Sequence, residues 1–277
     1  HGGSEALMGW YQGRALEPGL GRPRRRVSLP RRILHVGGVL ALLTLIAHVP
    51  WEGLRRRFAR LSDVRVEGTR YLEASRVVQA AGLATGQDLF TLDLGRARQA
   101  LLLEPRVASA EVDRRLPRGV RVRIIEREPV LLVDHGVPWE IDSAGVLLPP
   151  LETGVVADVP LLVGPRFDGL PGGVQVHRSQ VQRGLAWVRA LSARELQLAG
   201  LVSEVDVSDP TLTSLTLLDG TRVLAGGWPP GTPRLSALRV VIGDLKQRGT
   251  TASEVDLRFE NQVIVRPAAT TGGRHGG

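Results

Sequence analysis

Residues 89–130 read LFTLDLGRARQALLLEPRVASAEVDRRLPRGVRVRIIEREPV, and the spacing of their apolar residues changes partway along the stretch. The first third repeats apolar residues at helical spacing: Leu94, Ala97, Leu101 and Leu102. Asp93 can cap the first turn of this helix, and Pro105 ends it. After Pro105 apolar and polar residues alternate, which is typical of strands that bury one face. The stretch therefore predicts a helix followed by a β-hairpin.

The predicted hairpin has strands at residues 107–115 and 119–128, joined by the turn Leu116–Gly119. Because successive side chains of a strand point to opposite faces, alternate residues are expected to point inward together. These residues are Ala108, Ala110, Val112, Val120, Val122 and Ile124.

The sequence before the hairpin predicts another strand and another helix. DVRVEG at residues 63–68 alternates apolar and polar residues. YLEASRVVQAAGL at residues 71–83 has helical spacing, and Gly82 is suited to a left-handed cap at its end. Residues 61–128 thus read strand, helix, helix, strand, strand. The predicted unit is α+β, with two helices on one face of a three-stranded sheet.

An apolar run at residues 33–51 precedes this unit and contains no Asp, Glu, Lys or Arg. At 1.5 Å per residue, a helix of this length spans about the 30 Å hydrocarbon core of a bilayer. No Ala-x-Ala cleavage site follows the run, and Trp51 suits the membrane interface. We therefore predict a retained transmembrane helix. Six arginines precede it closely and five follow it. By this difference of one arginine, the positive-inside rule favours a cytoplasmic amino terminus and export of the rest of the chain.

The composition excludes several classes of function. The formal net charge is +8, but Lys246 is the single lysine, and the arginines that flank the apolar run suit anionic lipid head groups. No basic patch is interleaved with stacking aromatic residues, so nucleic acid is not an expected partner. Because the chain has no Cys, thiol catalysis, disulfides and thiolate metal sites are excluded.

The sequence after residue 128 predicts a second, β-rich domain with two helices. Residues 130–150 contain two apolar strands separated by turn residues, and the apolar spacing predicts a helix over residues 179–198, with Val181, Leu185, Val188 and Leu191 inward. A second amphipathic helix at residues 233–249 ends at Gly249. EVDLRFENQVIVRP at residues 254–267 predicts two short strands around a turn.

These features together resemble the FtsQ/DivIB family of bacterial cell-division proteins, in which a POTRA domain follows a single anchor. The residues that carry the resemblance are Phe90, Asp93, Pro105, Val107, Val112, Arg114, Arg115, Pro117 and the run Glu126–Pro129. Each of them alone is ordinary in a small α+β domain, but their joint order behind one anchor matches the family. The resemblance covers about residues 22–267.

The resemblance implies six parts along the chain. They are a cytoplasmic, largely disordered basic tail (1–32), a transmembrane helix (33–51), a linker (52–60), a POTRA domain (61–128), an FtsQ-type β domain with an exposed carboxyl-terminal strand edge (129–267), and a disordered tail (268–277). Such a chain is a single-pass type II protein of the inner (cytoplasmic) membrane, with its carboxyl-terminal domains in the periplasm or otherwise outside the cytoplasm, at the division septum.

The resemblance also implies a function without catalysis: a divisome scaffold that links early and late division proteins and binds FtsB (DivIC), which is paired with FtsL. A sheet edge can bind an extended peptide as an added strand. The expected partner-binding residues are Arg258, Phe259, Glu260, Asn261, Gln262, Val263, Ile264 and Val265. Phe259 is the expected aromatic anchor, Arg258 a rim contact or a contact to an acidic partner, and residues 263–265 the pairing strand. The alternative is that these apolar residues merely fill the edge of a core.

In the family this last segment usually reads Asp-Leu-Arg-Tyr, followed by a turn that ends in Gly. Residues 256–258 match, whereas Phe259 stands for the Tyr and Gln262 for the Gly. Phe259 keeps the ring and lacks the hydroxyl. If Gln262 adopts positive φ, strain of about 1 kcal/mol is expected; a longer turn is the alternative.

No pattern in the sequence indicates an enzyme, a metal site or a cofactor. The six histidines have no zinc-site spacing, and no Gly-x-Ser-x-Gly elbow or Walker loop is present. Asp134 and His135 precede a Gly and are interpreted as hairpin residues. No small-molecule substrate is expected, although carboxylates from distant strands can meet in a folded chain.

Two other interpretations remain open at this point. A POTRA-containing outer-membrane assembly or secretion factor also binds by strand addition, but it should repeat the POTRA pattern, which these 277 residues show once. A membrane-anchored hydrolase requires a deep pocket lined by interacting ionisable residues.

Overall fold

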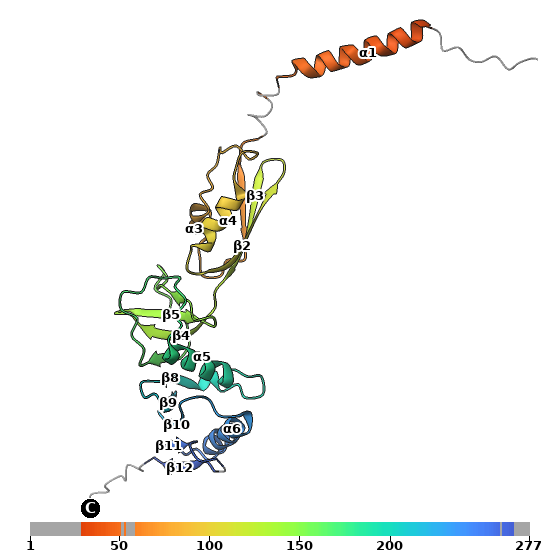
Figure 1. Cartoon of the computed structure of the whole chain (residues 1–277). Coiled ribbons are helices and arrows are strands. Elements are labelled where there is room, and N and C mark those ends of the chain that lie inside the picture. The colour runs from red at the N-terminus through yellow and green to blue at the C-terminus, as the bar shows by residue number, and fades with distance from the viewer. Residues whose placement is uncertain (1–28, 51–52, 54–58, 261, 269–277) are drawn as a thin grey trace, which may run out of the picture. The chain divides into compact units, whose positions relative to one another are not determined.

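The computed structural model describes residues 29–50, 53, 59–260 and 262–268, which are coloured in Figure 1. The chain divides into two units, residues 1–53 and 54–277. Most of the predicted basic tail, the end of the predicted anchor at Trp51, most of the linker and the predicted tail after Ala268 lie outside the described residues.

Helix α1 (Leu29–His48) contains most of the apolar run. It begins before the predicted Ile33, and its large apolar side chains from Leu34 to Ile46 are exposed. No helix within the described residues combines the length and the apolar composition that a membrane span requires. The crossing at residues 33–51 therefore stays a prediction.

The first domain, as we call the unit from β1 to β3, has the predicted order of strand, helix, helix, strand, strand. Its elements are β1 (Asp63–Glu67), α3 (Ala74–Ala80), α4 (Leu94–Leu102), β2 (Val107–Arg115) and β3 (Gly119–Glu126). The strand order is β1-β3-β2, with β1 parallel and β2 antiparallel to β3. Both helices share one core cluster with one face of the sheet (Figure 1), so the predicted arrangement is confirmed.

Local hydrogen bonds fix the ends of these helices. Asp93 Oδ1 accepts a hydrogen bond from Arg96 N at 2.9 Å, which is the predicted cap of α4. Gly82 has a φ of +65°, the predicted left-handed conformation after α3. The chain before α3 is held by Glu126, which accepts hydrogen bonds from three consecutive amides, those of residues 70–72, at 2.8–3.1 Å. A carboxylate at the end of β3 therefore positions the start of the first helix.

Two residues predicted to point inward are exposed. Ala108 lies beside a β-bulge between Val107 and Ser109, which interrupts the alternation so that Val107 is buried and Ala108 is not. Leu102 is the last residue of α4 and lies at the margin of the buried stripe. The remaining residues predicted to point inward in this domain are buried or half-buried.

Gly68, directly after β1, offers a test of how closely β1 and β3 approach. A Cβ at Gly68 (φ +89°) lies 2.0 Å from Ile124 O, whereas a Cβ at Gly86 (φ +94°) meets nothing within 4 Å. We expect Gly86→Ala to lower the free energy of unfolding by about 1–2 kcal/mol, the cost of positive φ alone. Gly68→Ala should cost at least about twice as much, because the strands must also separate. Urea unfolding of both variants checks this, and equal losses would contradict it.

The second domain, as we call the unit from β4 to β12, is a nine-stranded sheet with helices on one face. Its strands are β4 (Pro129–Asp134), β5 (Pro138–Asp142), β6 (Leu147–Leu148), β7 (Leu161–Val163), β8 (Val202–Asp206), β9 (Leu212–Leu217), β10 (Arg222–Gly226), β11 (Ala252–Asp256) and β12 (Ile264–Pro267). Its helices are α5 (Ser179–Leu191), the 3₁₀ helix η1 (Ala199–Leu201) and α6 (Thr232–Gln247). The strand order β12-β11-β10-β9-β8-β7-β4-β5-β6 places the last strand at one edge.

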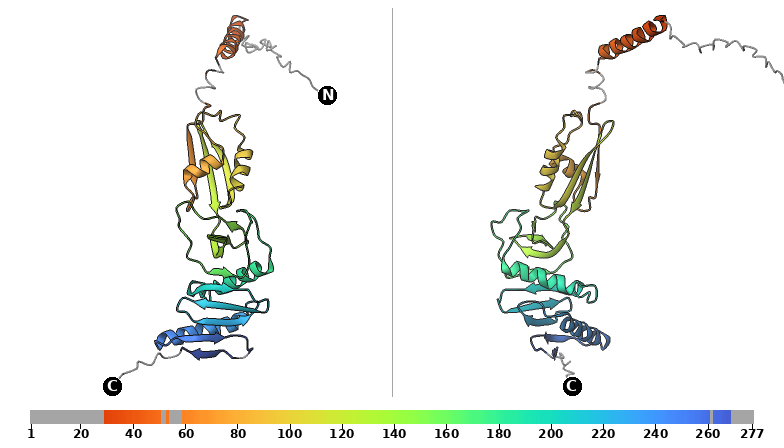
Figure 2. Two further views of the ribbon diagram at one scale, coloured as in Figure 1. Left: turned by 90° about the vertical axis from the view of Figure 1, so that its left-hand side faces the viewer. Right: turned by 45° about the vertical axis from the view of Figure 1, so that its right-hand side comes forward.

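Helices α5 and α6 cover the same face of this sheet, as Figure 1 and Figure 2 show together. The four residues of α5 that were predicted to point inward are all buried in a core shared with α6 and the strands. The predicted helix over residues 179–198 was wrong in its length. It ends at Leu191, because Leu198 N donates back to Leu191 O at 2.9 Å and Gln197 adopts a φ of +51°. This reversal buries Leu196 and Leu198 separately from the helix.

Two ion pairs link Arg106 of the first domain and Arg127, directly after that domain, to β5 of the second. Arg106 Nη2 donates to Glu140 Oε2 at 2.8 Å and to Pro149 O at 2.6 Å, and the two charged side chains are 3% and 5% exposed. Arg127 Nη1 donates to Asp142 Oδ2 at 2.8 Å. These pairs join residues outside the second domain to residues within it, so no local pattern in the sequence predicts them.

Candidate strand-addition edge

Strand β12 is the outermost strand of the nine-stranded sheet and, among the residues that the structure describes, pairs with β11 alone. The antiparallel register places Ile264 opposite Asp256, Val265 opposite Val255 and Arg266 opposite Glu254. All four residues of β12 are exposed. The two strands around a turn that the sequence predicts for residues 254–267 are therefore confirmed, and one of them lies at an edge.

Hydrogen bonds on both sides of β11 show which backbone groups of β12 face outward. Leu257 N donates to Leu224 O of β10 at 2.7 Å. Backbone groups alternate sides along a strand, so the N–H and C=O groups of Glu254 and Asp256 point toward β12. They lie opposite Arg266 and Ile264, respectively.

The end of β12 has the same alternation. Ala268 N donates to Thr251 O at 3.1 Å, so the N–H and C=O groups of the even-numbered residues of β12 point toward β11. The N–H and C=O of Val265 therefore point away from β11 and are available to a further strand. Pro267 also faces outward but has no N–H, which limits pairing to the first part of the edge.

The opposite edge of the same sheet is covered by the chain itself. Leu147 of β6 donates its N–H to Val174 O at 2.9 Å and accepts from Gly173 N at 2.8 Å. An isolated bridge between Val146 and Gln175 continues this pairing. The two ends of the sheet therefore differ: the β6 edge is occupied and the β12 edge is open among the described residues.

The structure gives Arg258 a partner within the chain. Its guanidinium donates to both carboxylate oxygens of Asp256 at 2.6–3.1 Å, and its backbone N–H donates to Asp256 Oδ1 at 3.0 Å. These hydrogen bonds, led by the one from the Arg258 side chain, hold the pKa of Asp256 below its ordinary value. Arg258 is thereby fixed at the start of the turn that leads to β12.

The turn between β11 and β12 presents the predicted aromatic anchor. Phe259 is 44% exposed, and Glu260 and Gln262 are exposed, whereas Val263 packs against the core. Asn261, also predicted to bind the partner, lies outside the described residues. The φ angle of Gln262 depends on the position of Asn261, so the strain considered for this residue stays a prediction.

Sequence reasoning missed one residue that shapes this site. Arg234 of α6 reaches the turn and donates hydrogen bonds to Leu257 O and Glu260 O at 3.4 and 3.3 Å. A hollow of about 480 Å³ lies between the start of α6 and the turn; its lining includes Arg234, Glu260 and Val263. No local pattern connects residue 234 with residues 257–260, so only the folded chain reveals this contact.

Asp134 and His135, which the sequence analysis interpreted as hairpin residues, lie in the hairpin of β4 and β5. Asp134 Oδ1 accepts from Gly136 N at 2.9 Å. His135 stacks on Trp139 with ring centroids 4.3 Å apart, and its Nε2 lies 3.0 Å from Leu170 O. The interpretation as turn residues is confirmed. Within the described ranges, no group of three or more His, Cys, Asp or Glu could hold a metal ion.

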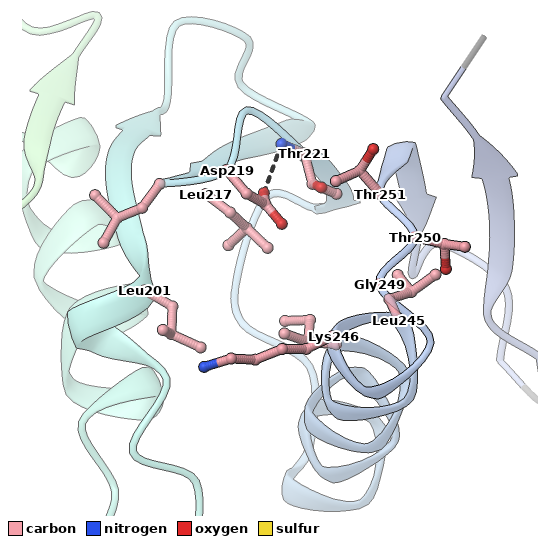
Figure 3. A pocket seen from close by; sticks show the side chains of 11 residues that line it. Leu201, Leu217, Asp219, Thr221, Leu245, Lys246, Gly249, Thr250 and Thr251 are labelled. Atoms are coloured by element: carbon pink, nitrogen blue, oxygen red, sulfur yellow. Dashed lines mark hydrogen bonds between the residues drawn. The ribbon is translucent and has the colours of Figure 1, made fainter. Parts of the chain in front are cut away.

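An apolar pocket of about 430 Å³ lies between η1, the β9–β10 turn and the end of α6 (Figure 3). Asp219 and Lys246 are the ionisable residues in its lining. Asp219 Oδ1 accepts from Thr221 N at 2.9 Å, and Figure 3 shows Lys246 extending toward Leu201 and away from Asp219. The pocket therefore lacks the interacting ionisable groups that a hydrolase requires.

Comparison with known proteins identifies relatives of the first domain. The family model described as "POTRA domain, FtsQ-type" matches residues 59–127. This range contains β1, α3, α4, β2 and β3. The matched range therefore has the fold that the sequence pattern predicts.

Curated relatives extend the similarity through both domains. The chain is 27% identical over 252 residues to the cell division protein FtsQ of Syntrophotalea carbinolica, an alignment that covers 87% of this chain and 89% of the relative. It is 28% identical over 255 residues to FtsQ of Anaeromyxobacter sp., covering 90% and 86%. FtsQ of Streptomyces venezuelae is 32% identical over 148 residues, 53% of each chain.

Proposed function

Because the chain belongs to the FtsQ family of cell-division proteins, we propose that it is a non-enzymatic divisome scaffold that binds FtsB, paired with FtsL, by strand addition. The observation that carries this proposal is the open edge at β12. An extended segment of FtsB pairs with the outward backbone groups of Val265, which gives affinity without any pocket for a small molecule.

The surroundings of β12 supply specificity for one segment. Phe259 offers an exposed ring beside the edge, and the ion pair between Arg258 and Asp256 fixes the turn that presents it. Ile264 and Val265 have exposed side chains on opposite faces of the strand. A partner strand with apolar side chains can therefore cover both faces of the edge.

The same proposal places the two domains outside the cytoplasm. Helix α1 exposes a continuous series of apolar side chains, which a bilayer would cover. With the amino terminus in the cytoplasm, the chain is a single-pass inner-membrane protein whose domains reach FtsB at the septum. A POTRA-containing secretion factor would use a similar edge, but the FtsQ-type match favours cell division.

Replacing Phe259 tests the contact to FtsB. We expect Phe259→Lys to weaken capture of FtsB about tenfold or more, because the charged side chain of Lys cannot replace an aromatic ring that the complex buries. Phe259→Tyr, which restores the residue usual in the family, is the matched control and should bind at least as well as the wild-type chain. The measurement is the affinity for FtsB in a pull-down or titration. Equal affinity of the Lys variant would contradict the proposed contact.

A further inference from the structure

One end of the first domain is assembled from three segments that are distant in sequence. These are residues 59–62, residues 86–92 and the β2–β3 turn at residues 114–118, which lie together where the chain enters the domain (Figure 1). Hydrogen bonds join them, among them Ser62 N to Arg118 O at 2.9 Å, Leu89 N to Ala59 O at 2.7 Å, and Arg114 Nε to Leu89 O at 2.9 Å. The β2–β3 turn is thus fixed next to the entry segment.

This end exposes two large apolar side chains. Leu116, in the β2–β3 turn, is 66% exposed, and Phe90, in the neighbouring segment, is 55% exposed. Neither belongs to the core cluster of the domain. The fold therefore gives them no partner among the residues of that core.

The charge of this end is positive. The arginines Arg60, Arg114, Arg115 and Arg118 are exposed here, and the carboxylates at the same end are Asp63 and Asp88. Among the described residues, Arg60, Arg115 and Arg118 form no ion pair. Exposed apolar side chains at the same end of a domain as arginines without ion pairs are the combination that binds an anionic lipid surface.

We propose that this end of the first domain, defined by Phe90, Leu116 and its four arginines, binds the anionic surface of the membrane in which α1 is anchored. The inference rests on the proposed function, because it requires α1 to be an anchor. The connecting chain permits it: from His48 to Ala59 an extended chain spans at most about 40 Å. Contact with the bilayer would hold the first domain close to the membrane surface. It would thereby limit how far β12 can move from the membrane.

The absence of cysteine from the sequence makes a site-specific test possible. Leu116→Cys and Ile125→Cys are matched labelling sites, since Leu116 is 66% exposed and Ile125, near the far end of β3, is 65% exposed. The full chain, labelled with an environment-sensitive fluorophore, is placed in nanodiscs of phosphatidylcholine alone or mixed with equal parts of phosphatidylglycerol. Quenching by lipids that carry nitroxide groups reports contact with the bilayer.

We expect the label at residue 116 to be quenched in the phosphatidylglycerol discs and the label at residue 125 not to be. Changing Arg115 and Arg118 to Glu should remove this quenching, because each arginine at an anionic surface strengthens binding about fivefold. Equal quenching at both sites, or none at residue 116, overturns the proposal.

A third label separates this proposal from the one on which it rests. Leu42→Cys lies within α1 and reports whether that helix is in the bilayer. Quenching at residue 42 without quenching at residue 116 overturns the proposed surface contact alone and supports α1 as a membrane anchor. No quenching at residue 42 overturns the anchor, and the surface contact fails with it.

Discussion

Replacing Val265 with proline is expected to abolish the capture of FtsB while the second domain stays folded. The N–H of Val265 points away from β11, so proline removes a donor that only an added strand would use. The proline ring also occupies the space that an incoming strand requires. Together these effects should weaken binding by at least about 2 kcal/mol, or thirtyfold. Titration of the full chain with FtsB measures the loss.

The neighbouring positions provide the controls for this result. Val265→Thr keeps both the N–H and the β-branched shape, so its affinity should stay near that of the wild-type chain. Ile264→Pro should also lose capture, but for a different reason: the N–H of Ile264 faces β11, and its loss breaks the sheet of the protein itself. Wild-type affinity in Val265→Pro, together with an unchanged thermal transition, would refute strand addition at this edge.

Glu140→Leu is expected to cause the largest loss of stability among the changes considered. Arg106 and Glu140 are almost completely buried, and the substitution leaves the guanidinium of Arg106 buried without its carboxylate. Breaking a buried pair in this way typically costs about 3–5 kcal/mol. Urea unfolding at neutral pH measures the change in the free energy of unfolding.

A double substitution distinguishes the buried charge from the lost packing. In the variant that combines Arg106→Met with Glu140→Leu, neither charge remains, so most of the lost stability should return. Pro149 O and the backbone N–H of Ala157 each lose one hydrogen-bond partner in this variant, which keeps the recovery incomplete. A loss of less than about 1 kcal/mol in the single variant would show that the pair does not hold the domains together.

The local sequence determined most of the elements of this protein. Alternating residues predicted β2 and β3, helical spacing predicted α4 and α6, and the cap at Asp93 and the glycines at residues 82 and 249 marked helix ends that the structure confirms. Such features depend on residues within one or two turns of each other, and their chemistry can be read directly from the sequence. The β-bulge at Val107 depends on the register with β3, and the early end of α5 depends on the reversal that buries Leu196 and Leu198, so neither was visible in the local pattern.

What only the tertiary structure decided is the arrangement of groups that meet from distant parts of the chain. The sequence predicted strands near residues 254–267, but only the sheet order shows that β12 is an open edge among the described residues. Hydrogen bonds show that β6 is covered, and those of Leu257 and Ala268 identify Val265 as the outward residue. The buried pair of Arg106 and Glu140 likewise joins residues of two domains. Local patterns carry no information on such contacts, because the free energy that fixes them arises only when the whole chain has packed.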